Sequence, residues 1–277
     1  MTRTEMSPKP PLTTIEQNQI VLVAHRLADA ARVETLAHFR NQALTEDNKL
    51  AKGFDPVTVG DRNAERAMRD ILDRDRPDDA ILGEEFGAKP GKSGLTWVLD
   101  PIDGTRGFIS GTPTWGVLIS IADETGPLYG IIDQPYIGER FEGGFGRADM
   151  NGPQGPRKLC SHAPRDLSDA IVLSTFPEIN TPRDQQGFQA VANKTKLTRY
   201  GMDCYGYALI ATGQVDLVIE AGLQAYDIQA PIAVVQAAGG VVTNWRGDPA
   251  HQGGQVIAAA NAQIHAQALA LLAPFAD

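Results

Sequence analysis

Several carboxylates in this chain stand where short apolar segments end. Asp100 and Asp103 come directly after one β-rich segment, and Glu84 and Glu85 come directly after another. Asp227 stands at the start of an apolar helical segment. A buried carboxylate is unfavourable unless it is paired or bound to a metal ion, and carboxylate oxygens are ligands that hard divalent cations prefer. The recurring placement therefore predicts a metal site built from these acids.

Residues 100–105 could join metal binding to phosphate binding. Pro101 fixes one backbone dihedral and favours an extended residue before it, so the turn can aim both aspartates and the Ile102 carbonyl at one point. Gly104 lets the backbone approach a ligand closely. If a helix begins there, its free N–H groups favour an anion. Thr105 could then orient a water molecule beside a bound phosphate.

Each of these acids also has an ordinary structural explanation. Asp-Gly is a common turn dipeptide, so Asp103 by itself is more often a turn or cap residue. Glu84 by itself is usually a solvated charge, and Asp227 by itself is most often a helix cap. The metal-site interpretation is nevertheless favoured, because several acids stand at the ends of short apolar segments.

The elements that would position these acids alternate along the chain. This order favours a layered α/β arrangement. The glycine-rich stretch 142–155 predicts a hairpin and loop, and it is the candidate boundary between a metal-binding subdomain, 14–150, and a subdomain that completes the site, 151–277. Residues 1–13 are expected to be a flexible leader. The hydrophobic periodicity predicts helices from 14 to about 39 and over 61–74, 205–212, 228–238 and 266–272, and strands over 80–82, 96–99, 115–122, 170–176, 215–220, 241–245 and 256–260, with another from 130.

The bulk properties restrict the class of protein. A chain of 277 residues is long enough for one large domain or two coupled subdomains. Its net charge of −9 argues against nucleic acid and anionic membranes as partners. Two cysteines cannot build a disulfide framework, and no run approaches the roughly 18 apolar residues that span a bilayer. We expect a cytoplasmic protein whose partner is a small molecule.

In order and spacing, three stretches resemble the inositol monophosphatase family. They are Gly83-Glu84-Glu85, residues 97–105, and Tyr226-Asp227 followed by Gly239-Gly240. The segment from Asp55 to Asp61 also resembles the family's D-x-V-T-x-x-D segment, and the resemblance covers roughly residues 15–265. It implies the five-layer αβαβα sandwich of sugar phosphatases and Mg²⁺-dependent hydrolysis with two or three ions per site. It also implies lithium sensitivity and, commonly, a homodimer.

The resemblance assigns roles residue by residue. The first metal would be held by Glu84, Asp100 and the Ile102 carbonyl, and the second by Asp100, Asp103 and Asp227; Glu84 would also contribute to a weaker third site. Phosphate would be bound by Asp103, Gly104 and Thr105. Thr105 and Glu84 would activate the attacking water, with Asp55 supporting Thr105. Glu85 would lie outside the metal ligands and help to hold them in place.

Other stretches are more similar to the histidinol-phosphatase branch of the family. These are residues 130–135 with 138–140, 201–205, and 215–220 with 225–227. Inositol-type members usually carry Trp at the position of Tyr226 and Gly-Thr-Ala at the position of 201–203. Histidinol phosphate carries an ammonium group and an imidazole, so carboxylates at Asp203 and Glu220, beside Asp227, suit it better than a neutral polyol. Alternatively, Asp203 caps the helix that begins near Cys204.

The leading hypothesis is a Mg²⁺-dependent phosphomonoesterase that hydrolyses histidinol phosphate by metal-activated water attack, in histidine biosynthesis. One alternative is an inositol-1-phosphatase or a broad sugar-phosphate phosphatase. Another is a non-catalytic relative that binds metal, which the presence of Glu84, Asp100, Asp103, Thr105 and Asp227 disfavours.

Overall fold

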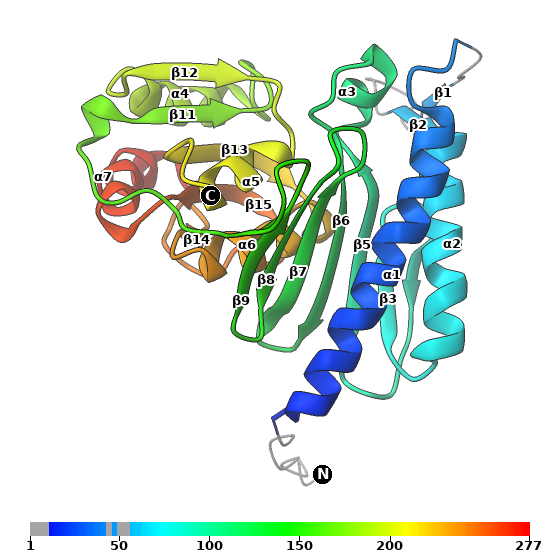
Figure 1. Ribbon diagram of the computed structural model, residues 1–277. Helices are drawn as coiled ribbons and strands as arrows, with labels where there is room; N and C mark the ends of the chain where they lie inside the picture. Colours follow the sequence, from blue (N-terminus) through cyan, green and yellow to red (C-terminus); the bar gives the residue numbers. More distant parts are fainter. Residues whose placement is uncertain (1–10, 43–45, 49–55) are drawn as a thin grey trace, which may run out of the picture.

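The computed structural model of this protein describes residues 11–42, 46–48 and 56–277. Within these ranges helices and sheets alternate in five layers, as expected from the family resemblance (Figure 1). Two helices, α1 and α2, cover the outer face of a large sheet. Helices α5 and α6 lie between that sheet and a smaller one, and α4 and α7 cover the smaller sheet's other face. The helices are α1 (Thr14–His38), α2 (Val59–Asp75), α3 (Thr105–Ser110), α4 (Pro182–Ala192), α5 (Tyr205–Ala211), α6 (Ala225–Ala237) and α7 (Ala262–Leu272).

The large sheet has eight strands in the order β10-β9-β8-β7-β6-β5-β3-β4. Neighbours are antiparallel except β3 and β5, which run parallel. Its strands are β3 (Ala80–Gly83), β4 (Gly87–Lys89), β5 (Thr96–Asp103), β6 (Gly116–Asp123), β7 (Gly126–Gln134), β8 (Glu139–Gly144), β9 (Arg147–Asn151) and β10 (Arg157–Lys158). A separate short pair, β1 (Glu46–Asn48) and β2 (Pro56–Thr58), precedes α2.

The smaller sheet has five strands in the order β12-β11-β13-β15-β14. Its members are β11 (Ile171–Ser174), β12 (Leu197–Tyr200), β13 (Leu217–Leu223), β14 (Val241–Thr243) and β15 (Gly254–Ala259). Successive side chains of a strand point to opposite faces. Accordingly, Leu173 and Val218 pack in the core with α5 and α6, whereas Val172 and Leu217 pack against α4 and α7. Both faces of β11 and β13 are covered, which explains the apolar runs 171–173 and 217–219 in these two strands.

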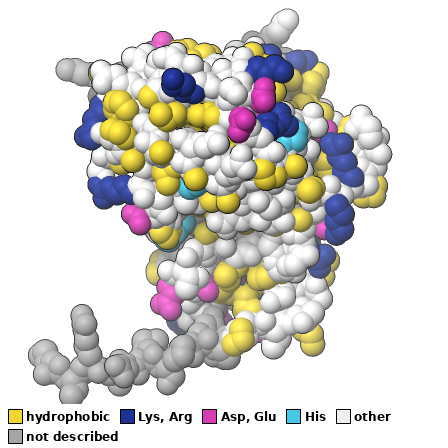
Figure 2. All heavy atoms as spheres, turned by 90° about the vertical axis from the view of Figure 1, so that its left-hand side faces the viewer, with side chains coloured by type: hydrophobic (Ala, Val, Ile, Leu, Met, Phe, Trp, Pro, Cys, Tyr) yellow, Lys and Arg dark blue, Asp and Glu magenta, His cyan; other side chains and the backbone are white. Residues whose placement is uncertain are grey.

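Figure 2 shows the side of the molecule formed by the smaller sheet and its outer helices. On this face, Lys and Arg side chains are scattered among small groups of hydrophobic side chains, and Asp and Glu are few. Among the helices of the described ranges, none combines the length and the apolar character needed to cross a bilayer.

Most expected elements are present, with shifted ends. The first helix is capped by Thr13, in a capping box in which the Glu16 carboxylate accepts the Thr13 N–H at 2.7 Å. The hairpin expected within 142–155 is confirmed by the pairing of β8 with β9, while the division at residue 150 stays a prediction. Helix α4 and strand β12 were not predicted, although Thr181-Pro182 with Asp184 is a capping-box signature.

The strand expected over 96–99 continues through Pro101 to Asp103. Asp100 pairs with Leu118 and Asp103 pairs with Gly116, so three steps along β5 match two steps along β6. The extra residue forms a bulge, where a missing backbone N–H is tolerated. Pro101 therefore bends the strand instead of ending it.

Candidate active site

The two acidic segments lie at the same edge of the large sheet. Strands β3 and β5 are parallel neighbours, and Gly83 pairs with Leu99. The N–H of Glu84 donates to the Leu99 carbonyl at 3.2 Å. Parallel strands present their carboxyl ends at one edge, so the placement of Glu84 beside Asp100 follows directly from the sheet topology.

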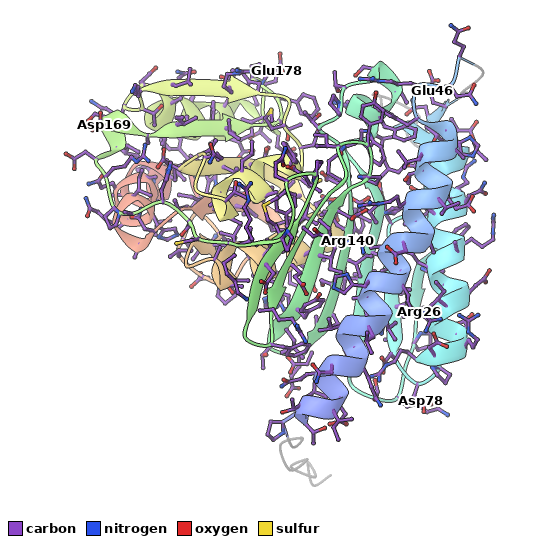
Figure 3. All side chains as sticks on the ribbon, in the orientation of Figure 1. Arg26, Glu46, Asp78, Arg140, Asp169 and Glu178 are labelled. Atoms are coloured by element: carbon purple, nitrogen blue, oxygen red, sulfur yellow. The ribbon has the colours of Figure 1, made fainter. Side chains whose placement is uncertain are left out.

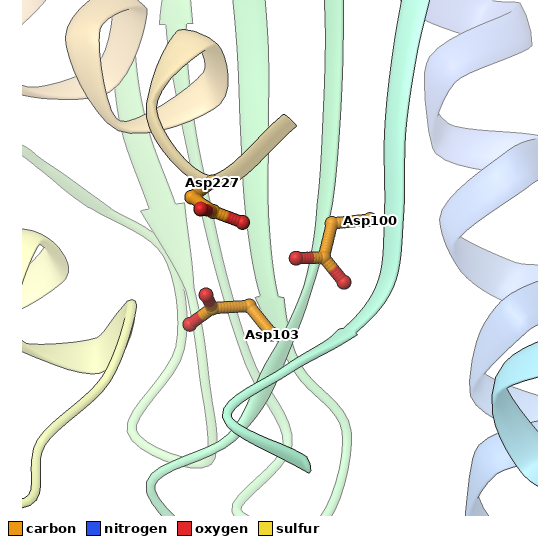
Figure 4. A group of neighbouring side chains, drawn as sticks. All are labelled: Asp100, Asp103 and Asp227. Atoms are coloured by element: carbon orange, nitrogen blue, oxygen red, sulfur yellow. The ribbon is translucent and has the colours of Figure 1, made fainter. Parts of the chain in front are cut away.

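Three carboxylates converge beyond this edge. Asp100 and Asp103 from β5 meet Asp227 from the first turn of α6 (Figure 4), and each offers an oxygen within 4.8 Å of the others. Asp227 also accepts the Gln224 N–H at 2.7 Å. Asp227 is thus the N3 residue of the capping box at Gln224. Because a carboxylate has two oxygens, this bond is compatible with the metal-ligand role, which stays a prediction.

The carboxylates crowd one another in a buried place. Burial raises the pKa of Asp100 well above its ordinary value, and the neighbouring charges of Glu84, Asp103 and Asp227 raise it further. Burial likewise raises the pKa of Asp103, which the charges of Asp203 and Asp227 reinforce, while the Cys204 N–H donating to it at 2.6 Å opposes the shift. A divalent cation would relieve this repulsion, and the donor set is one that hard cations prefer. These residues therefore fit a metal ion.

Thr105 is held beside the cluster. Its hydroxyl lies 3.5 Å from Asp61 Oδ1 and 3.2 Å from the Ile102 carbonyl oxygen. Asp61 is itself buried at the start of α2, where it accepts both the N–H of Thr58 at 2.8 Å and its hydroxyl at 2.5 Å. Burial raises the pKa of Asp61 to about 6.

Asp55, which was expected to support Thr105, lies outside the described residues, so that role stays a prediction. Among the described residues, Asp61 contacts Thr105. The signal was present in the sequence. Thr58 and Asp61 form a capping box, and this locks the Asp61 carboxylate at the start of α2, from which it reaches Thr105.

Gly104 connects the metal cluster to α3. Its φ is +83°, in the left-handed region that favours glycine. A Cβ at this position would lie 2.7 Å from Asp203 Cγ. The helix that was expected only conditionally is present as α3, which begins at Thr105. The phosphate-binding role of these residues stays a prediction.

The turn that carries Glu84 is fixed by a residue that the sequence reasoning missed. The buried Glu65 carboxylate accepts the N–H of Glu85 at 2.7 Å and the N–H of Phe86 at 3.2 Å. A Cβ on Gly83 would stand 2.0 Å from the same carboxylate. Glu65 lies one helical turn after Asp61 on α2, so one helix supports both Thr105 and the Glu84 turn.

These groups line a pocket of about 320 Å³. Of the expected site residues within the described ranges, only Glu85 is not part of its lining. Arg106, Thr175 and Phe176 were not foreseen. The complete lining is Glu84, Asp100, Ile102, Asp103, Gly104, Thr105, Arg106, Thr175, Phe176, Asp203, Glu220, Ala221, Gly222, Leu223 and Asp227.

Asp203 does not cap α5 through its side chain. The helix begins after Cys204, which is the N-cap residue and makes no side-chain cap bond. The Asp203 carboxylate instead accepts the Thr114 hydroxyl at 3.1 Å and lies against Gly104. Burial raises the pKa of Asp203, while the Thr114 bond and the charge of Arg106 act in the opposite direction.

Glu220 is buried at the pocket wall. It accepts the N–H of Thr175 at 2.7 Å, the hydroxyl of Thr175 at 2.8 Å and the hydroxyl of Ser174 at 3.3 Å. These bonds tie β13 to the end of β11. Burial raises the pKa of Glu220 to about 7.

Glu220→Gln is expected to raise the unfolding midpoint at pH 8, with a difference from the unmodified protein that shrinks as the pH falls toward 5. The pKa of Glu220 is higher in the folded state than its ordinary value of 4.5. The folded state therefore binds the extra proton between about 4.5 and 7, and ionisation through this window lowers stability as the pH rises. Thermal unfolding from pH 5 to 8 measures the effect. The exposed Glu124, in the turn between β6 and β7 and outside the pocket lining, provides the control variant Glu124→Gln. A constant difference at every pH would contradict the expectation.

Comparison with known proteins agrees with the geometry. The model of the inositol monophosphatase family matches residues 16–274. The chain is 37% identical to the bifunctional phosphatase IMPL2 of Arabidopsis thaliana, over 93% of this chain and 76% of that protein. It is 34% identical to the histidinol-phosphatase of Chlorobaculum parvum, over 86% of this chain and 91% of that one.

A solved structure extends the match to three dimensions. The inositol monophosphatase of Zymomonas mobilis superposes with a TM-score of 0.82 at 36% identity, covering 94% of this chain and 99% of that one. The match of the family model over nearly the whole chain, the five layers and the converging carboxylates support one conclusion. This chain is a phosphatase of the inositol monophosphatase family.

Proposed function

We propose that this phosphatase depends on Mg²⁺ and hydrolyses histidinol phosphate to histidinol and phosphate. The observation that carries the substrate assignment is Asp203, an additional carboxylate in the wall of the pocket that holds the acidic cluster. The similarity to proteins described as histidinol-phosphatases supports the same assignment.

One Mg²⁺ would be held by Glu84, Asp100 and the Ile102 carbonyl, and a second by Asp100, Asp103 and Asp227. When bound, the ions supply positive charge that neutralises the phosphate and lowers the pKa of a bound water. Glu84 would bring its carboxylate to both the metal and the water.

The chain itself positions the reactants. The Thr105 hydroxyl, held between Asp61 and the Ile102 carbonyl, would orient a water molecule for in-line attack, and Glu84 would receive its proton. The N–H groups of Gly104 and Thr105, at the first turn of α3, would donate to phosphate oxygens. Phosphoryl transfer of this kind needs positioning and charge rather than a covalent nucleophile.

The far wall of the pocket suits a cationic leaving group. A carboxylate has about four acceptor positions, and Glu220 uses three of them on Ser174 and Thr175. Glu220 would therefore accept at most one further bond, so Asp203 carries the larger share of amine recognition. An inositol leaving group offers only neutral hydroxyls, which do not offset these charges.

The second candidate is an inositol-1-phosphatase or a broad sugar-phosphate phosphatase. The similarity to the Zymomonas mobilis inositol monophosphatase favours it. Its metal and phosphate chemistry would be the same, so only substrate preference separates the two functions. The deciding measurement is phosphate release with Mg²⁺ from histidinol phosphate and from inositol-1-phosphate. We expect the higher kcat/KM for histidinol phosphate, and the opposite order would overturn the substrate assignment.

Asp203→Asn is expected to lower kcat/KM for histidinol phosphate about tenfold, with a much smaller loss for glycerol 2-phosphate, because a buried partner to a charged group contributes more than one to a neutral group. Steady-state kinetics with both esters measure the difference. The exposed Asp169, on the far side of the molecule (Figure 3), provides the control Asp169→Asn. Equal losses for the two esters would show that Asp203 acts on the loop geometry alone.

The homodimer, the lithium sensitivity and the cytoplasmic location expected from the resemblance stay predictions. Size-exclusion chromatography with light scattering tests the first, and inhibition by LiCl tests the second.

A further inference from the structure

The pocket contains one contact between its two walls that neither metal binding nor phosphate binding uses. The guanidinium carbon of Arg106 lies 4.6 Å from the centroid of the Phe176 ring. Arg106 belongs to α3, and Phe176 follows the end of β11. Both residues line the pocket, and Phe176 is 38% exposed. An aromatic ring is therefore presented to solvent beside a strongly polar site.

The backbone that carries the ring is held by the buried carboxylate of Glu220. The N–H and hydroxyl of Thr175, the residue before Phe176, both bond to Glu220. The Ser174 hydroxyl lies 3.5 Å from the Phe176 carbonyl oxygen. Arg106 directly follows Thr105, whose hydroxyl is held at the metal cluster. The ring is thus attached to a segment held by Glu220, and the guanidinium to a segment held at the metal cluster. Both groups are therefore fixed relative to the place where the phosphate would react.

The chemistry of this pair suits a planar ring. Arg guanidinium groups and aromatic faces both stack on flat π systems, and stacked aromatic pairs gain more than their buried area accounts for. The nearby carboxylate of Asp203 offsets the charge of Arg106, so a planar group is not excluded by repulsion. Arg106 already covers part of the Phe176 ring, so a planar group would stack on the exposed side of this pair, and an amine without a ring would leave that side uncovered.

We propose that Arg106 and Phe176 form a stacking platform for the imidazole ring of the leaving group, which makes Phe176 a specificity-determining residue. This inference rests on the proposed function, because histidinol phosphate supplies the ring. The platform recognises the ring, whereas Asp203 recognises the amine, so the two contributions are separable.

The test compares two esters. Histidinol phosphate has the ring, the amine and the phosphate, and O-phosphoethanolamine has the amine and the phosphate but no ring. Phe176→Leu keeps apolar volume and removes the aromatic face. We expect it to raise KM for histidinol phosphate about three- to tenfold, the range of one aromatic stacking interaction, with kcat and the constants for O-phosphoethanolamine unchanged. Inhibition by the product L-histidinol should weaken by the same factor.

Phe176→Tyr keeps the ring and is the matched control, expected to behave as the unmodified protein. If Phe176→Leu leaves the ratio of the two KM values unchanged, or if Phe176→Tyr changes it as much, the platform is wrong even where histidinol phosphate is the preferred substrate. The ratio between histidinol phosphate and inositol-1-phosphate in the unmodified protein reports the proposed function separately. A preference for inositol-1-phosphate overturns that function. In that case, a changed ratio of the KM for histidinol phosphate to the KM for O-phosphoethanolamine in Phe176→Leu still supports the platform.

Discussion

Asp100→Asn is expected to lower phosphatase activity by about 10³-fold or more, because the substitution removes a ligand shared by both proposed metal positions and each metal supplies several kcal/mol of charge stabilisation. The charges of Glu84, Asp103 and Asp227 all raise the pKa of Asp100. Phosphate release at saturating Mg²⁺ measures the loss, and titration calorimetry with Mg²⁺ should show weakened or absent binding.

The stability of this variant should move in the other direction. Without metal, Asp100 is a buried carboxylate crowded by like charges, so its neutral amide analogue should unfold at the same temperature or a higher one. Near-normal activity together with normal Mg²⁺ binding would end the metal-site interpretation.

Asp79→Asn is the matched control. Asp79 is equally buried, but it pairs with Arg76 at 2.6 Å and accepts the Trp97 Nε1–H at 2.9 Å, away from the pocket. This variant should lose stability and keep kcat, because it breaks a buried ion pair without touching the site. Asp100→Asn is thus expected to lose activity and keep its stability, whereas Asp79→Asn is expected to lose stability and keep its activity.

Thr105→Val is expected to lower kcat about 10²-fold while Mg²⁺ binding stays intact. The variant would no longer orient the water whose proton Glu84 receives, and positioned proton transfer contributes about 10²- to 10⁴-fold. The hydroxyl of Thr105 contacts Asp61 and the Ile102 carbonyl, and valine has the same shape without the hydroxyl. Thr105→Ser keeps the hydroxyl and should retain most of the activity. A large loss in the serine variant with none in the valine variant would show that the methyl group, not the hydroxyl, matters.

The partner of Thr105 can be identified by combining variants. Asp61→Asn should reduce kcat in the unmodified protein but add little to Thr105→Val, because residues that act as a unit are not additive. Asp55→Asn, at the position first expected to support Thr105, provides the comparison. If the losses of kcat in the two single variants add in the double variant, Asp61 does not act through Thr105.

Much of the site was determined by local sequence. Patterns within a few residues were enough to place an acid at a strand end, at Glu84 and at Asp100. They were also enough to place the glycine at 104 and the acid in the first turn of an apolar helix, Asp227. Capping, turn formation and burial periodicity are short-range effects, so a linear pattern carries them. The family resemblance used this same information.

What local patterns could not decide was which groups meet. The packing of α2 beside β5 brings Asp61 to Thr105, a contact that the segment's own residues do not specify, whereas the role expected of Asp55 stays a prediction. The contact of Arg106 with Phe176 joins different layers and had no linear signal. The continuation of β5 past Pro101 depended on a bulge against β6, a neighbour that the strand's own residues do not specify.

The convergence of Asp227 on Asp100 and Asp103 has a clear physical origin. Helix α6 lies so close to the large sheet that a Cβ on Gly130 would stand 2.8 Å from the Ala230 backbone, and a Cβ on Gly143 2.5 Å from the Ala233 carbonyl oxygen. These two glycines admit the helix, and its first turn then reaches the acidic edge of β5. The sequence by itself determined the types of the ligands and the local turns that hold them. Only the tertiary structure, through close packing across layers, decided that they form one site.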